Sequence, residues 1–245
     1  MKNFVCIILV SLVSLNGASA QTKNDTINQV DGKGLKQGHW IKNFPNGNVD
    51  YDGYFKDDRP AKLMRRYYNN GDIKSTFIYY DNDKACAAHI FYRDSIIMAQ
   101  GLYREEKKDS TWTYYGSTGL LAADENYKMG IRHGTSTVYN PAGKVYEQFT
   151  YHEGEKNGPW RQYFEEGNLK VEGQYAKEKL EGWTKFYNVD GGVSHEGLYR
   201  NNVKDSIWNH YDVKGKIEIQ QKYKMGRLKN ADEVSDYIEK KKAEK

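Results

Sequence analysis

The sequence predicts an all-β protein: an elongated antiparallel sheet of eight tandem 24-residue β-hairpin repeats, followed by a short C-terminal helix. The first observation is that WRQYFEEGNLKVEGQY, from Trp160, is written again as WTKFYNVDGGVSHEGLY, from Trp183, with its aromatics, its turn and its final Gly-x-Tyr. The second is composition. With 21 Tyr and 23 Gly but only 38% apolar residues, the chain is typical of exposed β-structure with frequent turns.

Residues 1–20 have the pattern of a secretory signal peptide. Lys2 precedes the apolar run VCIILVSLVSL, and Ala18-Ser19-Ala20 forms a small-residue cleavage site before Gln21. The run is too short to span a bilayer stably, and a short buried helix or strand is the alternative. We therefore expect an exported mature chain, periplasmic or extracellular and free of a transmembrane segment, with association to the cell envelope left open.

Charge and cysteine content narrow the function classes further. Loss of residues 1–20 removes one Lys and no acid, so the net charge falls from +4 to 36 − 33 = +3, with both signs mixed along the chain. This balance, without a long basic stripe, argues against a nucleic-acid partner. Cys86 would be the one remaining thiol, and we predict that it is buried; pairing with another chain is the alternative.

The repeat frame runs without insertion or deletion from residue 37 to residue 228. Its eight units begin at Gln37, Ala61, Ala85, Asp109, His133, Asn157, Glu181 and Asp205. Place seven is aromatic in seven units, place eleven is Gly in seven, place thirteen is always aliphatic and place nineteen is always aromatic. Such a period is the signature of stacked supersecondary units.

Each unit reads as two strands around a Gly turn, as in NNGD from Asn69 to Asp72. A three-residue type I turn closed by a Gly bulge would make places seven and thirteen cross-strand partners. Places thirteen, fifteen, seventeen and nineteen would then share one face, with the Trp of place four on the other and Trp183, one place early, flipped. A two-residue loop is the alternative and would split the aromatic set between the faces.

Two segments flank the repeats. Residues 21–36 are polar and are expected to form a flexible leader. In residues 229–245, Asn230 and Glu233 resemble a capping pair ahead of a Lys-rich helix that would cover the last strand, although a frayed charged tail is equally compatible.

The motif Gly158, Trp160, Tyr163, Gly167, Leu169, Gly173 and Tyr175 resembles the MORN-repeat variant found in the YwqK-type toxin-antitoxin system antitoxin family. The resemblance covers residues 37–228. It implies successive β-hairpins in an elongated sheet and, for function, protein scaffolding, phospholipid contact or neutralisation of a protein toxin. The third unit departs from the pattern, because Ala85-Cys86-Ala87-Ala88 replaces the Gly and Trp and Ser95 replaces the turn Gly.

No catalytic motif, metal-ligand spacing or cofactor motif is found, so we predict a non-enzymatic protein that acts by binding. An unknown protein partner is the first hypothesis, with glycan, peptidoglycan or phospholipid as alternatives. The Tyr at places seven and nineteen are expected to build the repeat core. Candidate partner-binding residues are the Trp of place four and two apolar residues of the divergent third unit: Trp40, Trp112, Trp160, Trp208, Ile96 and Met98.

Overall fold

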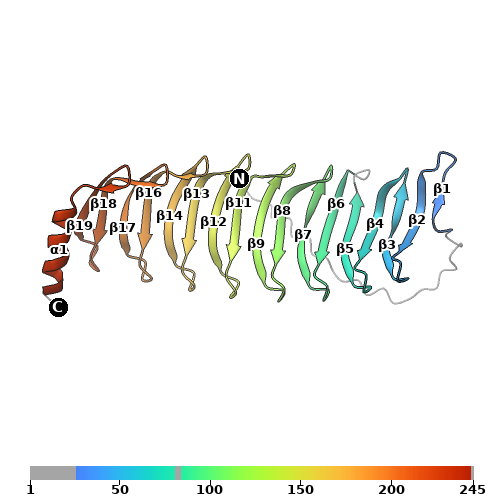
Figure 1. Ribbon diagram of the computed structural model, residues 1–245, viewed down its shortest axis with the longest axis horizontal. Coiled ribbons are helices and arrows are strands. Elements are labelled where there is room, and N and C mark those ends of the chain that lie inside the picture. The colour runs from blue at the N-terminus through green and yellow to red at the C-terminus, as the bar shows by residue number, and fades with distance from the viewer. Residues whose placement is uncertain (1–25, 81–83, 244–245) are drawn as a thin grey trace, which may run out of the picture.

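The computed structural model describes residues 26–80 and 84–243, and the proposed signal peptide lies outside this range. Its strands form one antiparallel sheet of twenty, ending in helix α1 (Figure 1). The elements are β1 (Gln29–Val30), β2 (Lys36–Asn43), β3 (Val49–Lys56), β4 (Arg59–Tyr67), β5 (Ile73–Tyr80), β6 (Ala85–Phe91), β7 (Ile97–Arg104), β8 (Lys107–Tyr115), β9 (Leu121–Lys128), β10 (Ile131–Arg132), β11 (Gly134–Tyr139), β12 (Val145–His152), β13 (Glu155–Tyr163), β14 (Leu169–Ala176), β15 (Lys179–Leu180), β16 (Gly182–Tyr187), β17 (Val193–Arg200), β18 (Val203–Tyr211), β19 (Ile217–Lys224), β20 (Arg227–Leu228) and α1 (Ala231–Ala243).

Two of the repeat strands are interrupted, and each consists of two short strands. Both β10 and β11 pair with β9, and both β15 and β16 pair with β14. Every unit therefore supplies two strands to a sheet that grows one hairpin at a time, which confirms the predicted all-β repeat architecture.

The hairpin turns have the predicted bulged geometry. In the second unit, the Gly71 N–H donates to the Tyr68 carbonyl and the Tyr68 N–H donates to the Asp72 carbonyl, with Gly71 at φ +97°. Tyr67 then faces Ile73, and places seven and thirteen are cross-strand partners in all eight units. The same main-chain pattern is closed by Ser95, at φ +63°, in the third unit.

The predicted distribution of side chains over the two faces was wrong. In addition to the Gly bulge of the turn, every unit has a register shift between places six and seven. This shift moves places seven and thirteen to the face opposite place nineteen. Trp160 consequently packs edge-on against Tyr175, with ring centroids 5.8 Å apart. On the other face, Tyr187 donates to Glu172 at 2.6 Å.

We call these the tryptophan face, which carries places four, seventeen and nineteen, and the tyrosine face, which carries places seven and sixteen. On the tyrosine face, the place-seven hydroxyl meets the place-sixteen side chain of the preceding unit in five units: Tyr115 with Gln100, Tyr139 with Asp124, Tyr163 with Gln148, Tyr187 with Glu172 and Tyr211 with Glu196. Each such bond ties one hairpin to the preceding one.

The core lies on the tryptophan face and is built by pairs of residues from adjacent units. Place four faces place seventeen of the preceding unit, and in several units a large side chain at place four lies on Gly at place seventeen, as for Met64 with Gly53 and Trp208 with Gly197. Trp160 differs, because it faces Phe149. The third unit reverses the order, since Ala88 faces Phe77. The side-chain volume lost at Ala88 is thus supplied by Phe77 of the neighbouring strand, which keeps the core of the tryptophan face packed.

Both ends of the sheet are covered by an asparagine. The Asn28 side chain accepts from the N–H of Ile41 and donates to the Ile41 carbonyl. At the other end, Asn230 accepts from the N–H of Lys222 and donates to the carbonyl of Gln220. Each amide thereby takes the place of a missing strand and blunts an open edge.

The N-terminal flanking segment is more ordered than expected where the structure describes it, and the C-terminal one forms the predicted helix. Gln29 and Val30 form β1 against β2, so this part of the expected flexible leader is a strand instead. The C-terminal segment takes the helical alternative, and the Asn230 side chain donates to the Glu233 carboxylate at 3.0 Å.

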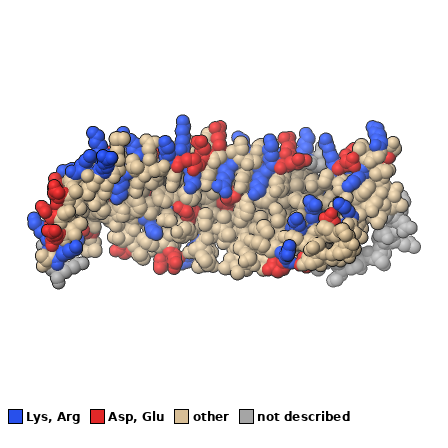
Figure 2. Space-filling model, viewed as in Figure 1, with Lys and Arg blue, Asp and Glu red and all other residues tan. Residues whose placement is uncertain are grey.

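Charged side chains gather along the long edge formed by the loops between units (Figure 2). Within the described residues, α1 is the one helix, and it is neither long nor apolar enough to cross a membrane.

Candidate binding sites

The third unit differs from the others in register as well as in sequence. The residue at place two has a positive φ in the other units, for example at Gly38, Ser110 and Gly182. Near this place the pairing with the strand of the preceding unit shifts its register by a bulge. Cys86 has no such φ, and β5 and β6 pair without a shift. Cys86 therefore lies opposite Tyr79 of the preceding strand.

In other units a basic residue usually holds this position. Lys108 faces Tyr103, and Lys204 faces Tyr199. The Lys108 ammonium lies 4.6 Å from the Trp112 ring centroid, and the Lys204 ammonium lies 4.1 Å from that of Trp208. Five such cations lie over the aromatics of the tryptophan face: Lys36, which directly precedes the first unit, and Lys108, Arg132, Lys156 and Lys204. Burial lowers the pKa of both Lys108 and Lys204, as expected for ammonium groups held against rings.

A cleft of about 660 Å³ opens where this cation is absent from two successive units. Pro60 and Cys86 hold the two positions, because they face Phe55 and Tyr79 respectively. The aromatic part of the cleft comes from Phe77, Tyr79 and Tyr103. Its remaining lining residues are Arg59, Pro60, Lys84, Ala85, Cys86, Glu105 and Glu106. We call this the third-unit cleft.

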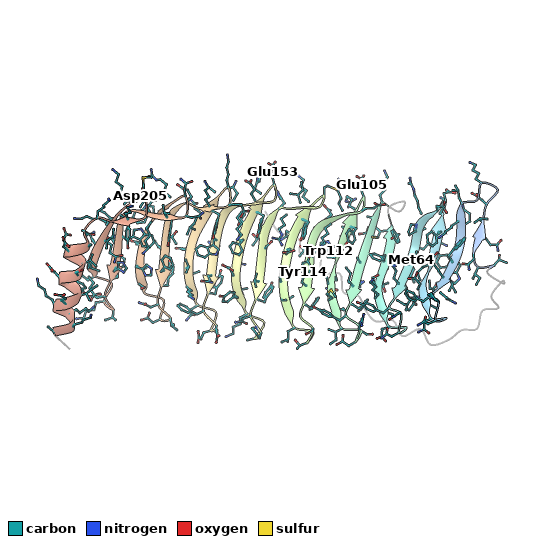
Figure 3. All side chains as sticks on the ribbon, viewed as in Figure 1. Met64, Glu105, Trp112, Tyr114, Glu153 and Asp205 are labelled. Atoms are coloured by element: carbon teal, nitrogen blue, oxygen red, sulfur yellow. The ribbon has the colours of Figure 1, made fainter. Side chains whose placement is uncertain are left out.

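The third-unit cleft combines a buried apolar floor with a charged rim. Burial raises the pKa of the Cys86 thiol, so the thiol is neutral at physiological pH, and the prediction that Cys86 is buried is confirmed. Burial also raises the pKa of Tyr103. Glu105 lies at the loop edge of the sheet, while Trp112 of the next unit lies over the middle of the strands (Figure 3).

Two of the four tryptophans predicted to bind a partner are core residues instead. Trp112 and Trp208 have no exposed surface, because each ring lies on a glycine of the preceding strand and donates its N–H to a main-chain carbonyl. Trp40 and Trp160 are half-buried, and their indole N–H groups bond to the Gln29 carbonyl and to Glu147. The place-four row is therefore mainly a packing element.

Ile96 and Met98 belong to the correct unit but lie away from the cleft. Both are half-buried near the Gly-turn end of β7, whereas the cleft residue Tyr103 lies near the other end. Ile96 packs beside Gly119 of the next hairpin loop. The structure thus does not bring them together with the cleft, and their role in a partner or dimer patch stays a prediction.

The most exposed tryptophan was not among the predicted site residues. Trp183 is 57% exposed on the tyrosine face, since it pairs with Leu198 while its neighbour Thr184 pairs with Gly197 on the tryptophan face. It lines a shallow groove of about 320 Å³ together with Pro159, Trp160, Arg161, Glu172, Gly173, Gln174 and Lys185. The sequence signal that could have marked Trp183 is its position, one place before the Trp of the other units.

Among the described residues, no group of three or more His, Cys, Asp or Glu side chains is placed to hold a metal ion. The geometry instead defines a repeat scaffold whose described residues include a solvent-open concavity on each face. The family model of the MORN repeat variant matches residues 36–57, 132–153 and 156–177, which fall on the first, fifth and sixth units. No curated protein matches the sequence. The resemblance to the antitoxin family stays a prediction.

Proposed function

We propose that this protein is an exported, non-enzymatic scaffold of the cell envelope that binds a protein partner through the tyrosine face around Trp183. The matched repeats and the open sheet support a binding scaffold as the general class. Export is inferred from the signal-like residues 1–20.

The exposed ring of Trp183 is the observation that carries this proposal. A side chain of this size that is 57% exposed is unusual in a sheet whose place-four tryptophans are half-buried or fully covered. Trp and Arg are enriched at the energetic centres of protein interfaces, and Arg161 lines the same groove. The hydrogen-bonded strands fix the backbone at Trp183, so ordering on binding is limited to its side chain.

Glycan binding is the second candidate, and the polar lining of the groove favours it. Gln174, Glu172 and Lys185 surround the indole with hydrogen-bonding groups, an arrangement that suits stacking of a sugar ring on its face.

The test is crosslinked co-purification of the tagged full-length protein from its native cells, with protein, glycan and lipid measured in the eluate. Trp183→Ala should lose the partner, with little change in stability because the ring is exposed. Ile207→Ala is the matched control, since Ile207 holds the same place in the next unit and is 44% exposed. Recovery of glycan or lipid without protein, or equal protein recovery from both variants, would overturn the proposal.

A further inference from the structure

We propose that the third-unit cleft receives a lysine side chain of a partner protein, with its ammonium over the rings of Phe77 and Tyr103. The proposed protein-binding function supplies the source of this lysine, while the chemistry follows from the repeat itself. The cleft is distinct from the Trp183 groove, because the two lie on opposite faces and in different units.

The other units show which group the cleft lacks. At five positions a basic side chain of the chain itself lies over the aromatics of the tryptophan face, for example at 3.9 Å between Lys156 and the Phe149 ring centroid and at 5.2 Å between Lys108 and that of Tyr127. An ammonium over a ring is attracted by the negative face of the π-system, and its alkyl stem packs along the apolar surface.

The third unit lacks both the large place-four side chain and the cation, and it replaces the first but not the second. Ala88 stands where four other units have Trp, and Phe77 of the facing strand supplies the bulk. Cys86 lies opposite a place-nineteen ring, a position that is Lys or Arg at four of the other seven pairings and Pro60, Leu180 or Leu228 at the remaining three. No described cation lies over Phe77 or Tyr103 in its place. The vacant position is therefore that of a cation on a flexible stem and not that of an aromatic ring.

The dimensions and charges of the cleft agree with such an occupant. Its volume of about 660 Å³ lies within the range of small-ligand sites, and it extends over two successive uncovered positions, Pro60 and Cys86. The side chains of Glu105 and Glu106 at the rim make no ion pair with a described residue. Arg59 and Lys84 balance their charge, so the attraction for a cation comes from the ring faces.

Saturation-transfer NMR with Nα-acetyl-lysine methylamide tests this assignment on the full-length protein. The matched probe is Nα-acetyl-norleucine methylamide, which keeps the alkyl stem and lacks the charge. We expect saturation of the lysine probe at roughly millimolar affinity and at least about fivefold weaker saturation of the norleucine probe.

Two variants locate the signal. Cys86→Lys supplies the missing cation from the chain itself and should abolish binding of the lysine probe. Leu180→Lys places the same residue at the equivalent position opposite Tyr175 and should leave binding unchanged. Equal saturation by both probes, or loss of the signal in Leu180→Lys but not in Cys86→Lys, would overturn the assignment.

A second measurement needs no change at the cleft. In a Cys6→Ser chain Cys86 is the sole thiol, and the lysine probe should slow its reaction with methyl methanethiosulfonate by about threefold or more near saturation, whereas the norleucine probe should not. An unchanged rate would contradict occupancy of the cleft. Binding of phosphatidylcholine vesicles that Cys86→Lys abolishes, without binding of the lysine probe, would assign the cleft to a lipid headgroup instead. Partner capture at Trp183 is a separate readout, so the two proposals can fail independently.

Discussion

Trp112 lies flat on Gly101 of the preceding strand: a Cβ atom at Gly101 would come within 2.5 Å of the indole. The Trp112 N–H donates to the carbonyl of the next residue, Leu102, at 2.9 Å, and the ring is fully buried. The same arrangement recurs for Trp208 on Gly197, with its N–H on the Leu198 carbonyl. In these two pairs a glycine of one unit makes room for the tryptophan of the next.

Replacing Gly101 should destabilise the protein because Trp112 has no room to move. We expect Gly101→Val to lower the free energy of unfolding by about 2–3 kcal/mol through overpacking. Denaturant unfolding followed by tryptophan fluorescence measures this change. Gly192→Ala is the control, since a Cβ there meets nothing closer than 3.6 Å, and it should change stability by less than about 0.5 kcal/mol. Equal effects at the two positions would contradict the packing role of Gly101.

Acid should weaken the C-terminal units through His195. Burial, with the positive charges of His210 and Lys204, lowers the pKa of His195 to about 4, and its ring stacks on Phe186 at 4.2 Å. Because the folded pKa lies below the unfolded value of about 6.5, this contribution is fully present above pH 6.5 and is lost as pH falls toward 4. After allowance for partial exposure, we expect a loss of about 1–2 kcal/mol.

The measurement is the thermal midpoint between pH 7 and pH 4 for the wild type and for His195→Phe, which keeps the stack without the titrating group. The variant should have a flatter profile over this window. Parallel profiles for the two proteins would show that His195 does not titrate with folding.

The asparagine at the C-terminal edge should hold both β19 and α1. Asn230→Ala removes two bonds to the edge of β19 and one to Glu233, and we expect a loss of about 2 kcal/mol. It also uncovers a strand edge, so self-association should rise, as measured by light scattering after size exclusion. Asn230→Asp keeps the acceptor for Lys222 and should be intermediate. A monomeric Asn230→Ala protein of unchanged stability would exclude this edge-protecting role.

Most of the fold could be predicted from the repeat frame of the sequence. Aromatic, Gly and aliphatic residues recur at fixed places, so hairpin count, turn type and the pairing of Tyr67 with Ile73 could be predicted. The faces could not, because the bulge before place seven involves residues such as Arg66 and Lys74 with no distinctive side chain. One unrecognised extra residue moves every side chain beyond it to the other face.

The candidate sites were only partly predictable for a related reason. The loss of Gly and Trp at Cys86 and Ala88 marked the third unit correctly. It did not show that the register shift disappears there and moves Cys86 opposite Tyr79, because pairing depends on the neighbouring strand. Trp183 could be recognised as an exception to the repeat frame. Its exposure could not be predicted, because it depends on which face of the sheet each place occupies.

The central structural claim is that Ala88 is fitted to Phe77, so that the third unit is packed differently from its neighbours and leaves a cleft. A double-mutant cycle with Ala88→Trp and Phe77→Gly tests this most directly, with unfolding free energies measured in denaturant. We predict that each single change destabilises the protein by about 2 kcal/mol or more, while the double variant recovers at least about 1 kcal/mol relative to their sum. Strict additivity of the two changes would contradict the claim.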